Sequence, residues 1–311
     1  MIRTFQTHCI RKQEELTGRL WTFTALSGDQ AGESFPVHTP SAWETYPGFG
    51  LYRGEGRYET TFSAGGNVRI ECKGVSHTAK VYVDDMLVGE HYNAYTPFSA
   101  VVQGLPRGEH TLAIVADNRF SDKSALHVPN DYMSYGGVTR PVAVEEVADV
   151  YLEGVHVTPC FDGKTWRAFV DAAVVNLAEE RPVALRISIA GKECVLSPQC
   201  LPEGESVLHA EFALEDVQVW SPETPKLYTV NVVLNVGGKE VDDLFDRFGF
   251  REIKMEGKHI LLNKEPLRIR RLCRHEDHPH FGCALPYEAM MHDVLLLKDL
   301  GANSVRTAHY P

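Results

Sequence analysis

Short runs of β-forming residues, interrupted by Gly, Pro or Asp, continue from Trp21 to about Ile253. Runs rich in Val, Ile, Thr, Tyr and Phe at roughly 8–12-residue spacing are typical of β-sandwiches, because each run crosses a sheet once and each interruption holds a turn. Asp84-Asp85 between two such runs indicates a tight hairpin joining residues 80–83 to 86–89. The chain is therefore predicted to be mainly β.

The β-rich region divides into two series. The first ends near Val147, and the second runs from Val150 to Ile253. The second series holds about seven runs in about 100 residues, which favours an immunoglobulin-like sandwich, although the Cys pairing of antibody domains is missing. We therefore predict one sandwich domain over residues 1–148 and an immunoglobulin-like β-sandwich over residues 149–253.

The pattern changes after Ile253. Residues 258–262 and 267–269 look like strands, residues 286–300 look like a helix, and residues 304–306 look like another strand. Strand, helix, strand is the opening of a parallel α/β unit. A closed eight-stranded barrel needs roughly 200 residues or more, so residues 254–311 are predicted to be the truncated, incomplete start of a TIM barrel, with its first two strands and first helix.

Charge and cysteine usage exclude several function classes. With 31 basic and 42 acidic residues the formal net charge is −11, which argues against nucleic-acid and anionic-membrane partners. The first residues lack the apolar stretch of a secretory signal, so a cytoplasmic location is predicted. Seven scattered cysteines without a C-x-x-C pair indicate reduced thiols and no zinc site.

Several stretches resemble glycoside hydrolase family 2. Residues 274–279 and 303–311 resemble the barrel entrance of that family. Residues 130–132 and 135–141 resemble its junction between the jelly roll and the central sandwich, and residues 220–228 and 248–251 resemble the central sandwich itself. The likeness covers the chain from Trp21 to Pro311.

The resemblance implies a jelly-roll β-sandwich, an immunoglobulin-like sandwich and a (β/α)8 barrel. It also implies retaining hydrolysis of β-glycosides by two glutamates, which in the family lie on later barrel strands and are expected beyond Pro311. No catalytic residue is therefore assigned in this chain, which is predicted to be inactive alone. A β-galactosidase type is favoured over a glucuronidase because Arg274 precedes His275. The implied partner is a β-glycoside or oligosaccharide, no cofactor or metal is assigned, and homo-oligomerisation stays open.

Four positions match supporting residues of the family's sugar pocket. Asp131, His275 and His309 are expected to contact the sugar, and Arg306 is expected to keep the nucleophile ionised, which suits a permanent, planar cation. Structural alternatives stay open for each of them: an Asx-turn for Asp131, a salt bridge inside the barrel for Arg306, and a hydrogen-bonded strand-end histidine for His309. Residues 275–280 are alternatively a solvated loop or a metal site.

One position departs from the family pattern, because Arg271 stands where a glycine is usual. Glycine there allows close approach of backbone or ligand, whereas an arginine requires room and a partner. Two other interpretations of the chain stay open, the second of which is favoured by this departure and by the missing glutamates. It is a non-catalytic carbohydrate-binding or assembly module, or it is the remnant of a truncated gene.

Overall fold

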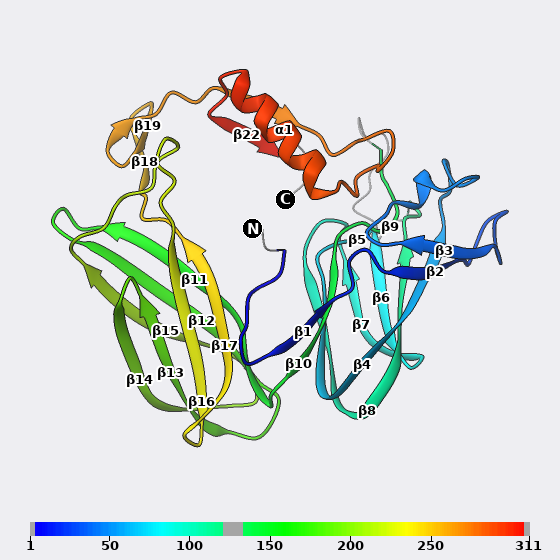
Figure 1. The fold of residues 1–311 in the computed structure, drawn as a ribbon, viewed down its shortest axis with the longest axis horizontal. Coiled ribbons are helices and arrows are strands. Elements are labelled where there is room, and N and C mark those ends of the chain that lie inside the picture. Colours follow the sequence, from blue (N-terminus) through cyan, green and yellow to red (C-terminus); the bar gives the residue numbers. More distant parts are fainter. Residues whose placement is uncertain (1–3, 121–132, 308–311) are drawn as a thin grey trace. The chain divides into compact units, whose positions relative to one another are not determined.

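The protein, seen in a computed structural model, is described over residues 4–120 and 133–307. It divides into two compact units (Figure 1). One unit comprises Met1–Lys12 and Val147–Ile269, and the other comprises Gln13–Glu146 and Arg270–Pro311. Strands dominate both units, as the sequence predicts.

The second unit is built on an eight-stranded sheet of jelly-roll type. Its main path runs β1-β10-β4-β8-β6-β7, β2 pairs with β3 and β4, and the short strands β5 and β9 pair separately. The bounds are β1 Lys12–Glu15, β2 Leu20–Ala25, β3 Ser34–His38, β4 Glu55–Cys72, β5 Val75–Ser76, β6 Thr78–Val83, β7 Met86–Tyr92, β8 Phe98–Asp117, β9 Gly137–Val138 and β10 Val142–Val147, with a 3-10 helix at Trp43–Thr45. The predicted hairpin is confirmed, because Asp84 and Asp85 form the turn between β6 and β7 with φ of 47° and 61°.

An aromatic cluster fills the core of this sandwich. The ring of Phe23, on β2, lies 5.1–5.4 Å from the rings of Phe35, Tyr46, Phe49 and Tyr58. Trp43 is completely buried beside them, 6.2 Å from Phe23. The cluster fixes the 3-10 helix that follows β3, and this helix carries the buried side chain of Glu44.

The first unit contains the predicted immunoglobulin-like sandwich. One sheet has the order β11-β12-β15 and the other β14-β13-β16-β17. The bounds are β11 Val150–Phe161, β12 Trp166–Asn176, β13 Arg181–Ile189, β14 Lys192–Leu201, β15 Gly204–Leu214, β16 Tyr228–Val236 and β17 Lys239–Phe248. Alternate residues of β12 and β13 are buried, because one face of each sheet packs on the shared core.

The segment after this sandwich differs from the sequence prediction. Strands β18 Ile253–Glu256, β19 His259–Leu262 and β20 Glu265–Pro266 form a small antiparallel sheet that belongs to the first unit. The predicted strand at 267–269 is wrong, since residues 267–270 belong to no strand, although the Leu267 N–H bonds back to the Ile260 carbonyl. The first barrel strand is β21 Arg271–Arg274 instead.

The predicted barrel opening of strand, helix and strand is present in the second unit, with its helix and second strand confirmed and β21 in place of the predicted first strand. It consists of β21, helix α1 Tyr287–Asp299 and β22 Ser304–Thr307 (Figure 1). Pro286 begins the helix, and Gly301 ends it with φ of 77°, a left-handed conformation that favours glycine. Within the described ranges, no helix has the length and apolar character that crossing a membrane requires.

Candidate functional site

The two barrel strands bring two of the four predicted site residues to one edge of a sheet. β21 and β22 are parallel, with Cys273 opposite Arg306, so their carboxyl ends lie together. Arg306 Nη1 lies 3.9 Å from Cys273 Sγ, and His275 directly follows β21. His275 and Arg306 are both exposed. Active sites of barrels form at this carboxyl edge.

The other two predicted residues, Asp131 and His309, lie outside the described residues. Their roles, like those of His275 and Arg306, stay predictions. Arg271, the departure from the family pattern, is exposed on β21 opposite Ser304, so its side chain has room.

Ion pairs surround His275 on both sides in the sequence. Arg274 donates from Nη1 to Glu276 Oε1 at 3.0 Å and from Nε to Asp293 Oδ2, on α1, at 2.9 Å. The Arg274 and Glu276 side chains are only 11% and 14% exposed. Arg274 is therefore engaged by two protein carboxylates through Nε and Nη1, whereas its buried Nη2 has no hydrogen-bond partner among the described residues.

The loop between β21 and α1, residues 275–286, is held by two side chains of the jelly roll. The Tyr135 hydroxyl donates to the Asp277 carboxylate, and Arg140 donates to the Glu276 carboxylate and, at 2.7 Å, to the Cys283 carbonyl. Burial, and then the hydrogen bond to Asp277, raises the pKa of Tyr135 well above its usual value. Its hydroxyl thus stays a proton donor at any physiological pH.

Glu44, in the 3-10 helix, holds the segment that carries Tyr135. Its carboxylate accepts hydrogen bonds from the Gly136 N–H at 3.0 and 3.1 Å and from Asn118 Nδ2 at 3.1 Å. The Glu44 side chain is 4% exposed, and the Arg53 guanidinium lies 4.0 Å away. Gly136 is so close to Trp43 that a Cβ would stand 2.0 Å from the indole, so no other residue fits there without rearrangement.

Burial raises the pKa of Glu44 from 4.5 to about 7, although the hydrogen bond from Gly136 opposes the shift. The folded state therefore binds this proton more tightly than the unfolded state, and stability falls as pH rises from 4.5 through 7. The shift corresponds to about 3 kcal/mol at most.

Replacing Glu44 with glutamine should remove this part of the pH dependence, because the amide does not titrate. We expect the free energy of unfolding of Glu44→Gln, measured with urea at about pH 5 and about pH 8, to fall less with pH than that of the wild type. The exposed variant Glu33→Gln serves as the control and should keep the wild-type slope. Equal slopes for Glu44→Gln and the wild type would refute the assignment.

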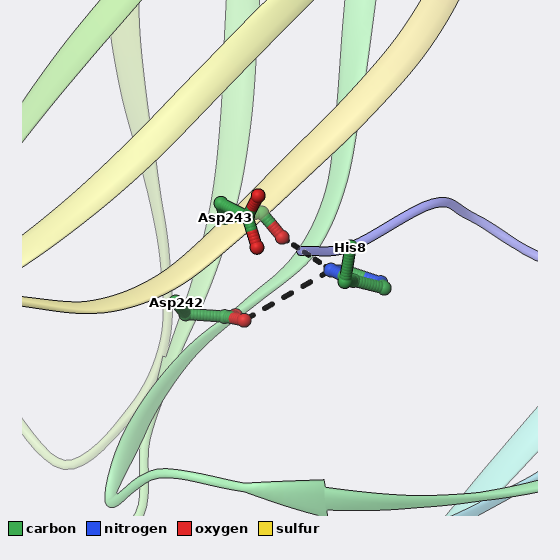
Figure 2. Close-up of side chains that lie close together, drawn as sticks. All are labelled: His8, Asp242 and Asp243. Atoms are coloured by element: carbon green, nitrogen blue, oxygen red, sulfur yellow. Dashed lines mark hydrogen bonds and ion pairs between the residues drawn. The ribbon is translucent and has the colours of Figure 1, made fainter. Parts of the chain in front are cut away.

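The first unit contains a separate cluster of His8, Asp242 and Asp243 (Figure 2). His8 Nδ1 contacts the Asp243 carbonyl oxygen and lies 3.9 Å from Asp242 Oδ1. The Asp243 carboxylate accepts from two backbone N–H groups just after His8 at 2.7–3.0 Å, and Asp242 pairs with Arg11 at 2.6 Å. Since both carboxylates already have donors, we interpret the cluster as the anchor of the N-terminal segment and not as a metal site.

Sequence reasoning missed Tyr135, Arg140 and Glu44 as parts of the site. Tyr135 and Arg140 belong to the 135–141 stretch that resembles the family's domain junction, but nothing local indicates which residues they contact. Their partners lie 136 to 143 positions further along the chain. Glu44 carries no sequence signal at all, because its burial arises only when the aromatic core closes over it.

Comparison with known families decides the relationship. Residues 150–251 match the family described as glycosyl hydrolases family 2, and residues 253–311 match the TIM barrel domain of the same family. The chain belongs to glycoside hydrolase family 2. The jelly-roll, immunoglobulin-like and barrel parts seen here are those of that family's N-terminal portion.

Relatives within family 2 differ in the sugar that their names state. The solved β-galacturonidase of Eisenbergiella tayi, bound to galacturonate, is 48% identical with a TM-score of 0.94 over 100% of this chain and 56% of its own. A β-galactosidase of Thermoanaerobacter pseudethanolicus is 29% identical over 93% of this chain, and a β-glucuronidase of Streptococcus agalactiae is 29% identical over 76%. The chain spans about half the length of the solved relative and 40–41% of these two curated ones.

Proposed function

We propose that the chain is the N-terminal portion of a retaining β-glycosidase that removes a galacto-configured sugar, with a β-galacturonide preferred over a β-galactoside. The observation that carries the proposal is the 48% identity to a β-galacturonidase along the whole chain, against 29% for the β-galactosidase and the β-glucuronidase. The presence of Arg274 before His275 does not carry the choice of sugar, since the Arg274 side chain binds Glu276 and Asp293.

In the proposed reaction, one glutamic acid protonates the glycosidic oxygen while a second glutamate attacks the anomeric carbon, so that the aglycone leaves as an alcohol. Water then releases the sugar from the glycosyl-enzyme, with the first residue now acting as base. Both glutamates are proposed to lie beyond Pro311. This chain would supply the supporting residues: Asp131, His275 and His309 toward the sugar, and Arg306 beside the nucleophile.

Two proteins test this proposal. The first is the 311-residue chain itself, which should show no turnover of 4-nitrophenyl β-galacturonide, β-galactoside or β-glucuronide. The second is the product of the open reading frame that carries residues 1–311, read to its stop codon, which should hydrolyse the galacturonide at least about tenfold better than the galactoside, the discrimination typical of one charged contact. Turnover by the 311-residue chain would contradict the placement of the glutamates, and a preference for the galactoside would contradict the choice of sugar.

Residue roles require a protein with a complete barrel. A chimera serves this purpose: residues 1–311 replace the corresponding part of the Eisenbergiella tayi β-galacturonidase, whose remaining barrel is kept. Identity of 48% and a TM-score of 0.94 make a compatible junction reasonable to expect.

A further inference from the structure

We propose that Tyr135 and Arg140 of the jelly roll are positioning residues, which hold the β21–α1 loop so that His275 is preset to receive the sugar. The inference rests on the proposed function and goes beyond it, since it assigns to the jelly roll a part in preparing the barrel's binding site. All the contacts involved lie within the second unit.

Arg140 connects the jelly roll to the first barrel strand through one carboxylate. Glu276 Oε2 accepts from Arg140, and Glu276 Oε1 accepts from Arg274 at 3.0 Å. Both oxygens of the carboxylate are thus used by guanidinium groups from two different parts of the fold. Charge-assisted hydrogen bonds of this kind are about twice as strong as neutral ones, and a guanidinium fixes direction as well as distance.

Arg140 Nη1 and the ring of Tyr135 fix the loop at residues 282–283. Arg140 Nη1 donates to the Cys283 carbonyl at 2.7 Å. Tyr135 packs with Cys283 and Ala42 in a small buried cluster, and a Cβ on Gly282 would stand 2.7 Å from the Tyr135 ring. Gly282 has φ of 55°, so only glycine gives both the turn and the close approach.

The Tyr135 hydroxyl fixes the start of the loop, where it donates a hydrogen bond to the Asp277 carboxylate. The loop is therefore attached to the jelly roll at 276–277 and again at 282–283. Tyr135 itself is 9% exposed and its neighbour Gly136 is hydrogen-bonded to the buried Glu44, so a buried jelly-roll residue holds the segment that carries the attachment point.

His275 lies between two residues whose side chains are ion-paired, Arg274 and Glu276. Its backbone is consequently fixed, while its side chain is exposed at the carboxyl edge of the barrel strands. A binding residue held in this way loses less conformational freedom when ligand arrives, which is the usual gain from preorganisation.

The first test uses hydrogen exchange of the 311-residue chain and needs no activity. In Tyr135→Phe and Arg140→Lys, the backbone amides of residues 275–286 should exchange about tenfold faster than in the wild type, as the loss of one such hydrogen bond implies. Matched controls are Tyr46→Phe, which loses a half-buried hydroxyl bonded to Ser41, and Arg107→Lys, which loses a bidentate pair with Glu146. Among the described residues, neither Tyr46 nor Arg107 forms a hydrogen bond, ion pair or ring contact with the loop, so both variants should leave its exchange unchanged.

The second test separates positioning from a purely structural role. In the chimera, Tyr135→Phe and Arg140→Lys should raise KM for the β-galacturonide and the inhibition constant of galacturonate by about the same factor, roughly tenfold, with kcat within about twofold, because His275 is proposed to bind ground state and transition state alike. The two control variants should match the wild-type chimera.

The outcomes are distinct. Unchanged exchange in both variants overturns the attachment. Faster exchange with unchanged KM overturns positioning and leaves a purely structural contact. A wild-type chimera without activity counts against the proposed function and removes the role of the loop with it, whereas an active chimera with unaffected variants counts against positioning alone.

Discussion

Replacing Asp242 with alanine should lower the free energy of unfolding of the first unit by about 3–5 kcal/mol. Its carboxylate accepts from Arg11 Nη2 at 2.6 Å and from the Leu152 N–H at 2.7 Å, and the side chains of Asp242 and Arg11 are 2% and 1% exposed. The variant would remove the carboxylate that pairs with the buried Arg11 guanidinium. Desolvation of an uncompensated charge is among the largest single-residue costs in proteins.

Urea unfolding measures this effect, and Asp246→Ala is the matched control. Asp246 lies on the same strand, β17, but is exposed, so its loss should change stability by less than about 0.5 kcal/mol. The double variant Arg11→Met with Asp242→Leu should recover part of the loss, since it removes both charges. If Asp242→Ala unfolded at the same urea concentration as Asp246→Ala, the anchor would not have the importance we assign to it.

In the chimera, Arg306→Ala should lower kcat/KM for the β-galacturonide about 100-fold, the size typical of removing one charged group beside a reacting centre. An adjacent cation favours the ionised form of a carboxyl group, so its loss should raise the pKa of the nucleophile. The acid limb of the pH–rate profile should then move to higher pH. Arg306→Lys should keep the positive charge but lose the planar guanidinium, so it should retain only part of the activity.

Arg271→Ala is the control for Arg306, because Arg271 is also exposed on the same two-stranded sheet and has no proposed role. Its kcat/KM should stay within about twofold of the wild-type chimera, in line with a surface substitution. A similar loss for both variants, or an unshifted acid limb for Arg306→Ala, would show that Arg306 does not act on the nucleophile.

Local sequence patterns predicted the elements whose cause is local. The Asp84-Asp85 turn, the seven strands of the immunoglobulin-like sandwich and helix α1 all follow from turn residues, side-chain alternation or helical periodicity within the element itself. The error at 267–269 has a local cause too. A short apolar run resembles a strand, but a strand requires a paired ladder, and here residues 267–270 belong to no strand although the Leu267 N–H bonds to the Ile260 carbonyl.

The sequence by itself determined the mainly β architecture, the opening of the barrel and the family, and it placed His275 and Arg306 at neighbouring strands. The tertiary structure alone decided the connections between distant segments: Arg11 with Asp242, Tyr135 with Asp277, and Arg140 with Glu276. The physical reason is that a backbone pattern acts over a few residues, whereas a buried charge or hydroxyl requires a partner that only the closed fold can bring to it.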